Sequence, residues 1–311
     1  MAKCATREAY GKALALLVKE KENVLVLDAD LTKSTKTSMA QEVAPERHFN
    51  MGIAEGNMMS VAAGMAAQGD VVYASSFAMF ATGRAFEQIR NSIAYPNLNV
   101  KICGTHSGIT VGEDGASHQA IEDIAIMRAI PNMRVFQPCD ERETMAVIRA
   151  VYDLEGPCYV RLGRLAVEDV YTDETFKFEL GKGNVIKEGK DVVILASGYM
   201  VQQTVGALEG LAAKGITPTV IDIHSIKPLD EELILEKCKD AKLVVTCEEH
   251  TVIGGLGSAV SALLSTKMPR KMLMIGLNDT FGESGTPAAL MDAYGLDSKA
   301  IVEKVSKALG E

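Results

Sequence analysis

The stretch VVYASSFAMFATGRAFEQIRNSIAYPNLNVKICGTH (71–106) begins and ends with a short apolar run typical of a β-strand, VVYASS at 71–76 and VKICGTH at 100–106. Further runs of this kind in the first half of the chain are VLVLDAD at 24–30, RVFQPC at 134–139 and CYVRLG at 158–163. Apolar residues recur at helical spacing between them, in Glu55–Ala67 and Gln119–Ala129. The alternation indicates βαβ units, and near-continuous apolar strands favour a parallel sheet with helices on both faces. We therefore expect a three-layer α/β/α domain.

A second α/β series follows an irregular acidic segment, AVEDVYTDETFKFELGKG at 166–183. Its strand-like runs are DVVILASG at 191–198, TPTVIDIHSI at 217–226, KLVVTCEEH at 242–250 and KMLMIGLND at 271–279. A chain of 311 residues is also longer than one hydrophobic core usually serves. We predict a first domain at 1–166, a linker at 167–185 and a second domain, again three-layered with a mostly parallel sheet, at 186–311.

The composition is that of an ordinary globular protein, with 47% apolar and 23% charged residues. A net charge of -9 argues against a protein that wraps nucleic acid, which needs clustered Lys and Arg. No run approaches the roughly 20 apolar residues of a membrane span, and Arg7, Glu8 and Lys12 interrupt the N-terminal apolar stretch in a way that a signal peptide would not. Six cysteines without a CxxC pair suggest reduced, buried thiols. We expect a cytoplasmic protein without nucleic-acid or membrane partners.

Active sites of open parallel sheets form at the carboxyl ends of the strands. In this chain that rule selects the segments 28–34, 52–57, 75–80, 104–118 and 161–164. In the second of them, Glu55 lies between a short strand and a helix. Its carboxylate either stabilises the helix terminus or, in an apolar place, exchanges a proton with a ring nitrogen of a bound cofactor.

Two further segments contain candidate binding or catalytic residues. Phe77 and Phe80 follow a strand end, where they are either core residues or a stacking platform for a flat ring. In THSGITVGEDGASHQ (105–119), the glycines permit a tight turn that presents Asp114 and His118 together. Either histidine of this segment could be structural, and a metal site is disfavoured because no compact ligand spacing completes one. GGLGSAV at 254–260 is only a weak dinucleotide-binding motif.

Taken in order, GIAEGN (52–57), SFAMF (76–80), THSGITVGEDGASHQ (105–119), PNMRVFQPCDERE (131–143) and EEHTVIGGLGSAV (248–260) resemble the transketolase family. The resemblance covers nearly the whole chain. It corresponds to the pyrimidine-binding domain followed by the C-terminal domain of that family. The glycine–aspartate motif that holds magnesium and diphosphate in the family's first domain has no counterpart in this sequence.

The resemblance implies a transketolase-type glycolaldehyde transferase that moves a two-carbon ketol unit between sugar phosphates with thiamine diphosphate, as in the pentose phosphate pathway. The cofactor would be shared with a partner chain that also binds Mg²⁺ or Ca²⁺, and this chain would bind no metal. Cofactor contacts fall on Glu55, which would activate the aminopyrimidine, on Phe77 and Phe80, which would stack it, and on Asp30. The residues that the resemblance implies to contact the substrate are Arg7, Ser34, His106, Asp114, His118 and Arg161. Those that it implies to be catalytic are Glu55, His118 and His106.

The implied partner is an N-terminal transketolase subunit that carries the diphosphate- and metal-binding domain, in an α2β2 heterotetramer; a homodimer of this chain alone is the other arrangement. One departure from the family is Gly83 followed by Arg84, where many full-length transketolases have a third aromatic residue. Packing of the pyrimidine ring is therefore expected to differ there.

Four alternatives stay open. The C-terminal half of a 1-deoxyxylulose-5-phosphate synthase shares the acidic glycine turn, although His106 favours transketolase. The β subunit of the decarboxylating component of a 2-oxoacid dehydrogenase has a similar length, but GEDGASHQ fits it poorly. A non-catalytic transketolase-like partner subunit is opposed by the retention of Glu55, Asp114 and His118. The sheet pattern with GGLGSAV also admits a flavodoxin-like nucleotide-binding protein.

Overall fold

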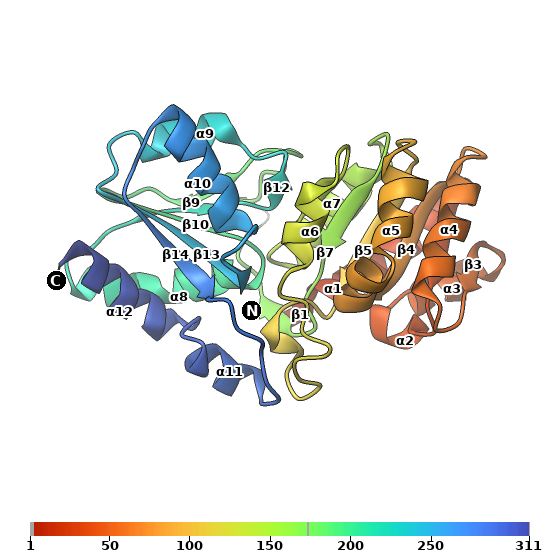
Figure 1. Ribbon diagram of the computed structural model, residues 1–311, viewed down its shortest axis with the longest axis horizontal. Helices are drawn as coiled ribbons and strands as arrows, with labels where there is room; N and C mark the ends of the chain where they lie inside the picture. Colours follow the sequence, from red (N-terminus) through yellow and green to blue (C-terminus); the bar gives the residue numbers. More distant parts are fainter. Residues whose placement is uncertain (1–2, 173, 311) are drawn as a thin grey trace.

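The computed structural model describes residues 3–172 and 174–310 and shows two α/β domains side by side (Figure 1). The first contains a seven-stranded sheet in the order β12-β6-β7-β5-β4-β2-β3. All neighbouring pairs in it are parallel except β12 with β6. Its strands are β2 (Val24–Asp28), β3 (His48–Asn50), β4 (Val71–Phe77), β5 (Val100–Thr105), β6 (Arg134–Phe136), β7 (Cys158–Arg161) and β12 (Ser225–Lys227).

Helices cover both faces of this sheet, as the apolar strands predict. One core cluster lies under α4 (Glu55–Ala66) and α6 (Asp123–Ala129) and includes Met58 and Met127. The other lies under α1 (Thr6–Glu20), α3 (Ser38–Val43) and α7 (Glu141–Tyr152) and includes Leu14. Because the strands are buried on both sides, their apolar residues need no alternation. The three-layer α/β/α class is confirmed for this domain.

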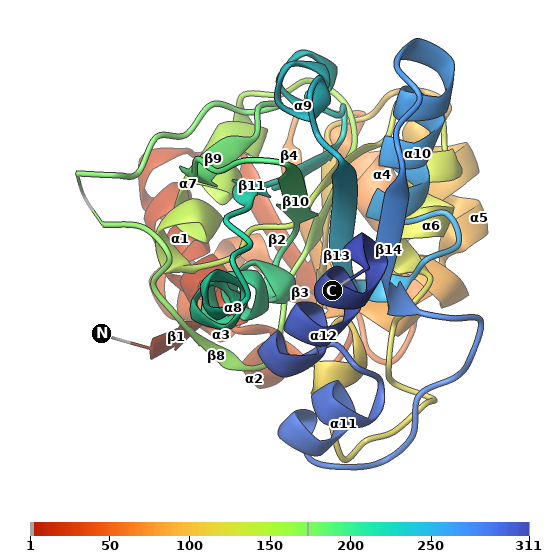
Figure 2. The same ribbon diagram turned by 90° about the vertical axis from the view of Figure 1, so that its left-hand side faces the viewer.

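The second domain repeats the plan around a five-stranded sheet in the order β14-β13-β10-β11-β9, in which only β9 is antiparallel to its neighbour. Figure 2 shows α8 and α12 on one side of this sheet and α9 on the other. The strands are β9 (Asn184–Lys187), β10 (Val192–Ala196), β11 (Thr219–Asp222), β13 (Leu243–Thr251) and β14 (Met272–Leu277). The helices are α8 (Tyr199–Ala213), α9 (Glu231–Cys238), α10 (Leu256–Lys267), α11 (Pro287–Ala293) and α12 (Ser298–Leu309).

Chain segments cross between the predicted domains. Strand β12 lies within the second half of the sequence but pairs with β6 at the edge of the first sheet. The predicted linker overlaps β8 (Ala166–Glu168), which pairs antiparallel with β1 (Lys3–Ala5), and it reaches into β9. The exact domain boundaries therefore stay a prediction, while the division into two α/β domains is established.

The structure also bears on the state of the cysteines and on the presence of membrane-spanning helices. All six cysteines are free and buried, which is how reduced thiols in apolar surroundings behave. Among the described residues, no helix is long and apolar enough to cross a membrane.

Candidate functional site

Four aromatic side chains gather at the carboxyl ends of β4 and β5. Phe77 is the last residue of β4, and its ring centroid lies 3.9 Å from that of His106, which directly follows β5. The ring of Phe80 lies 6.3 Å from Phe77, nearly parallel to it, and 5.1 Å from His118 in an edge contact. Parallel strands end at the same edge of a sheet, so residues distant in sequence converge there. The structure thus brings four of the predicted site residues together as one ring cluster.

Glu55 is the first residue of α4 and is only 2% exposed. Its carboxylate accepts a hydrogen bond from the Ser76 hydroxyl at 3.3 Å, and Ser76 directly precedes Phe77. Its other oxygen accepts one from the Arg84 guanidinium at 2.8 Å. The helix N-terminus also favours a negative charge at this position. Glu55 is therefore a buried, oriented carboxylate next to the ring cluster.

Two arginines, Arg7 and Arg164, lie near enough to His106 of the cluster for their charges to act on it. The Arg7 guanidinium, in α1, donates to the backbone carbonyl of Ser34 at 2.7 Å and to that of Arg164 at 3.3 Å. The Arg164 guanidinium donates to the carbonyl of Val111 and to the Glu113 carboxylate. Backbone oxygens thus hold both guanidiniums in place, that of Arg7 next to the predicted Ser34, and part of their donor capacity remains for an anion.

Burial and the charges around His106 lower the pKa of its side chain. Burial, followed by the positive charges of Arg7 and Arg164 and by His118, lowers the pKa of His106 to about 3. Its Nδ1 lies 2.9 Å from the Thr105 hydroxyl, and its backbone adopts a left-handed conformation with φ of 56°. The imidazole is therefore neutral at physiological pH, and it can contribute hydrogen bonds to a ligand but no charge.

The glycine turn of the 105–119 segment forms as expected. Gly112 and Gly115 have positive φ values of 87° and 74°, and the His118 amide donates to the Gly115 carbonyl. Asp114 lies exposed at the turn, and His118 is half-buried with its Nδ1 2.9 Å from the Ser117 hydroxyl. The following helix, α6, begins only at Asp123 because the Gly108 amide bonds to the Ala120 carbonyl and keeps the chain extended there.

The second domain supports this turn directly. The side-chain amide of buried Gln119 donates through Nε2 to the backbone carbonyl of Glu283, in the loop before α11. A Cβ added at Gly115 would collide with the Ser284 hydroxyl, and one at Gly112 would lie 3.2 Å from Pro287. Contacts this close leave no room for larger residues. The loop of the second domain thus fixes the position of the turn that carries Asp114 and His118.

The segment after β2 is held by a separate polar cluster. Buried Asp28 pairs with His48 at 2.8 Å and accepts a hydrogen bond from the Thr37 hydroxyl. Asp30 is exposed, has a φ of 61° and bonds through its amide to the side chain of Asn50. The structure therefore places Asp30 at the carboxyl edge of the sheet, while among the described residues it shows no contact between Asp30 and the ring cluster.

The surroundings of Arg161 favour a structural role for this predicted substrate contact. The residue is 1% exposed, and its guanidinium forms a two-pronged ion pair with Asp123 of α6 at 2.7 and 3.1 Å. It also donates to the carbonyls of Ala120 and Glu249, and the bond to Glu249 ties β7 to β13 of the second domain. Although burial acts to raise it, the pKa of Asp123 lies below its usual range because of this arginine. In this structure Arg161 is a buried residue held in an ion pair, and this geometry favours a structural role over contact with a substrate phosphate.

Sequence reasoning overlooked two arginines that the structure brings to the site, Arg164 and the Glu55 partner Arg84. A signal existed for the first, because the strand-end rule selects residues 161–164 as a segment. Side chains two apart on a strand share a face, and Tyr159 donates to the same Asp123 as Arg161 does. That periodicity assigns Arg161 to the sheet face and Arg164 to the loop.

Other candidate ligand sites lie elsewhere. Within the described part of the chain, one group of metal-ligating side chains is close enough to share an ion: Cys139, Glu143 and Asp222. All three are buried where the domains meet, Cys139 just before α7, Glu143 on α7 and Asp222 on β11. Burial raises the pKa of Glu143 to about 7 and that of Asp222 well above its usual range, which favours carboxyl groups that retain a proton. This group belongs to the domain junction and not to the ring cluster.

The glycine-rich segment at the start of α10 is filled by the protein itself. Both oxygens of the buried Glu248 carboxylate accept backbone amide hydrogens there, from Leu256 at 2.7 Å and Gly257 at 2.8 Å. A Cβ at Gly255 would collide with this carboxylate. Because the Glu248 carboxyl group already occupies the amides of the helix N-terminus, the geometry argues against the nucleotide-binding alternative.

Comparison with known proteins matches both domains. The family model for the transketolase pyrimidine-binding domain matches residues 2–169, and that for the transketolase C-terminal domain matches residues 181–301. A Methanocaldococcus jannaschii protein described as a transketolase C-terminal section is 50% identical over 96% of this chain and 94% of its own length. A Clostridium 6-deoxy-6-sulfo-D-fructose transketolase subunit is 38% identical over 95% of this chain and 92% of its own. An apulose-4-phosphate transketolase subunit from Phocaeicola vulgatus is 35% identical over 96% of this chain and 95% of its own.

Solved structures agree with this match. A split-gene transketolase, described as an inactive beta4 tetramer, superposes with a TM-score of 0.91 at 53% identity and covers 98% of both chains. The Pichia stipitis transketolase in complex with sedoheptulose 7-phosphate superposes with a TM-score of 0.83 at 24% identity, over all of this chain and 46% of that one. At that identity the second comparison establishes the fold alone.

Proposed function

Because the chain belongs to the transketolase family, we propose that it is the C-terminal subunit of a split transketolase, which transfers a two-carbon ketol unit between sugar phosphates. The observation that carries the proposal is the buried carboxylate of Glu55 next to the ring cluster of Phe77, Phe80, His106 and His118. A carboxylate that can exchange a proton, next to flat apolar faces, suits the activation of an aminopyrimidine ring.

The residues fit thiamine diphosphate as the cofactor. Its aminopyrimidine has two flat faces and a ring nitrogen, and the site offers the Phe77 and Phe80 rings together with the Glu55 carboxylate. When bound, thiamine diphosphate supplies the electron sink for breaking and forming the carbon–carbon bond. Glu55 holds and releases a proton at the ring nitrogen, and the phenylalanines orient the ring and exclude water from it. Asp30 approaches the cofactor from the end of β2.

We assign the substrate's terminal anion to the arginine pair. Arg7 and Arg164 are fixed next to Ser34 and His106, and together they present the fork-shaped donors that match phosphate oxygens. Asp114 and His118, on the turn beside the rings, bind hydroxyls of the donor sugar, and His118 moves a proton. This assignment replaces Arg161 of the sequence-based prediction by Arg164.

A partner chain completes the enzyme in this proposal. Relatives of nearly the same length are named as transketolase subunits, and the homotetrameric split-gene relative is described as inactive. The partner would supply the diphosphate grip and the Mg²⁺ or Ca²⁺ ion. We propose an α2β2 heterotetramer, with a homo-oligomer of this chain as the state that it adopts without its partner.

Reconstitution tests the function. The purified chain alone should show no two-carbon transfer, and mixing it with a chain that carries the glycine–aspartate diphosphate motif should produce transfer from a ketose phosphate to an aldose phosphate. Robust turnover by the isolated chain would reject the split-enzyme proposal. Cofactor binding by the complex without any transfer would favour the non-catalytic subunit, and pyruvate decarboxylation would favour the synthase or dehydrogenase alternatives.

Replacing Arg164 by alanine should selectively weaken the binding of phosphorylated donor sugars. Loss of a charge-assisted hydrogen-bonding pair of roughly 1.5–3 kcal/mol predicts an increase in KM of about 10- to 100-fold. The measurement compares fructose 6-phosphate with fructose in the reconstituted complex, and Arg149→Ala, which removes a guanidinium paired with Glu20 on the surface, is the control. Equal effects of Arg164→Ala on both sugars would contradict a phosphate role.

A further inference from the structure

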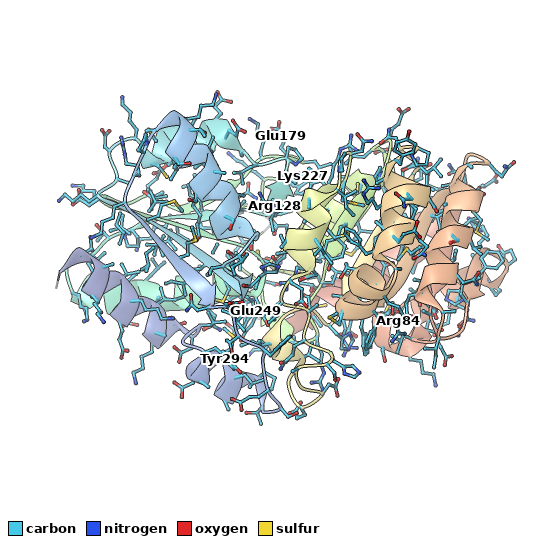
Figure 3. The ribbon with its side chains drawn as sticks, in the orientation of Figure 1. Arg84, Arg128, Glu179, Lys227, Glu249 and Tyr294 are labelled. Carbon is cyan, nitrogen blue, oxygen red and sulfur yellow. The ribbon has the colours of Figure 1, made fainter. Side chains whose placement is uncertain are left out.

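The partner of Glu55 is an unexpected residue for a proton-exchanging carboxylate. The Arg84 Nη1 atom lies 2.8 Å from Glu55 Oε2, and the guanidinium carbon of Arg84 lies 4.8 Å from the centroid of the Phe80 ring. Glu55 is buried, whereas the Arg84 side chain is 51% exposed. Figure 3 shows Arg84 in the first domain, away from the junction marked by Glu249. One cation thus covers both a ring face and the carboxylate of the proposed cofactor site.

The local backbone brings Arg84 to this position. Phe80–Arg84 forms a π-helical turn, η2, and the Thr82 hydroxyl bonds back to the Ala78 carbonyl within it. A π turn accommodates one residue more than an α turn, and such turns occur frequently at functional sites. Gly83 lies within this turn, and a Cβ there would lie 2.9 Å from the flexible terminal methyl of Met79. The turn therefore brings Arg84 back over Phe80, the residue at which it begins.

Building on the proposed function, we infer that Arg84 is a positioning residue that occupies the Glu55 carboxylate until the aminopyrimidine ring of the cofactor displaces it. A planar guanidinium stacked on Phe80 and bonded to Glu55 makes the same two kinds of contact as an aminopyrimidine ring would make. The guanidinium and the ring therefore compete for the Phe80 face that Arg84 covers and for the Glu55 carboxylate. Because Arg84 is half exposed, it can turn into solvent without moving the helix.

The exchange also frees the carboxylate for the ring. Departure of Arg84 leaves Glu55 Oε2 without its guanidinium donor, so that this oxygen can bond to a ring nitrogen. While Arg84 is in place, the buried carboxylate has a partner, which avoids the cost of an isolated buried charge.

Calorimetric titration of the reconstituted complex with thiamine diphosphate and Mg²⁺ tests the inference without requiring turnover. Arg84→Met keeps the length of the side chain and removes the competing charge, so it should bind the cofactor about two- to fivefold more tightly, the range expected for loss of a half-exposed ion pair. The affinity of Arg84→Lys for the cofactor should remain close to that of the unchanged protein. Arg90→Met is the matched control, since the Arg90 guanidinium bonds to its neighbour Asn91.

A double-mutant cycle separates competition for Glu55 from a general structural effect. In a Glu55→Gln background, Arg84→Met should change the affinity by less than about twofold, because no carboxylate holds the guanidinium. Unchanged or weaker binding by Arg84→Met in the otherwise unchanged protein would overturn the inference and leave the proposed function standing. Absence of cofactor binding by the unmodified complex would reject the proposed function and the inference together.

Discussion

Replacement of Glu55 by glutamine is expected to reduce turnover of the reconstituted complex by about 10²- to 10⁴-fold, the usual contribution of general acid–base catalysis. The carboxylate is buried at the start of α4, beside Ser76 and Arg84. Glutamine retains the volume and an acceptor oxygen, but it cannot exchange a proton with a ring nitrogen. The loss should therefore appear in kcat, measured as ketol transfer at saturating cofactor.

The control for this variant is Glu87→Gln, because Glu87 is a nearby carboxylate that bonds to Gln88 and Asn91 on the surface. It should turn over at close to the normal rate. Thermal unfolding of both variants shows whether the fold is retained. A Glu55→Gln complex that is folded, saturated with cofactor and nearly as active as the unmodified one would remove Glu55 from the mechanism.

Arg161→Ala is expected to destabilise the protein by about 3–5 kcal/mol and not to alter substrate preference. The substitution leaves the Asp123 carboxylate buried with its main cationic partner removed, and it breaks the hydrogen bonds to the Ala120 and Glu249 carbonyls. A buried charge that loses its partner costs far more than an exposed one. Urea denaturation of the chain measures the change in the free energy of unfolding.

Two further variants make that result interpretable. Arg161→Met combined with Asp123→Leu removes both charges and should lose less stability than Arg161→Ala, since no ion remains unpaired. Arg149→Ala, which breaks the exposed pair with Glu20, should cost no more than about 1 kcal/mol. A stable Arg161→Ala protein with weakened binding of phosphorylated donors would restore the substrate role that the buried position disfavours.

Much of the candidate site was accessible from the sequence. The strand-end rule selects the segments that contain Glu55, Phe77, His106 and His118, and the structure brings these residues to one edge of the first sheet. The rule works because parallel strands all end on the same side, whatever their order in the chain. It does not say which side chain of a segment points toward the edge, and the burial of Arg161 in an ion pair with Asp123 is what favours Arg164 for the site.

The contributions of the second domain lay beyond sequence reasoning. Its loop before α11 contacts Gln119 and the glycine turn, and its strand β12 completes the edge of the first sheet. The Glu248 carboxylate fills the helix terminus for which the glycine-rich motif suggests a nucleotide. Each of these contacts joins residues that are distant in sequence, or depends on how the chain folds around them, so no short motif encodes them.

The sequence by itself determined the two α/β domains with mostly parallel sheets and the family, because apolar periodicity and the order of short motifs are local properties of the chain. Only the tertiary structure decided which arginines serve the site. Arg161 on β7 faces Asp123 and is buried, Arg164 in the following loop joins Arg7, and Arg84 is carried by a π-helical turn onto Glu55. The direction and burial of a long charged side chain depend on what packs against it in space, and the sequence does not state that.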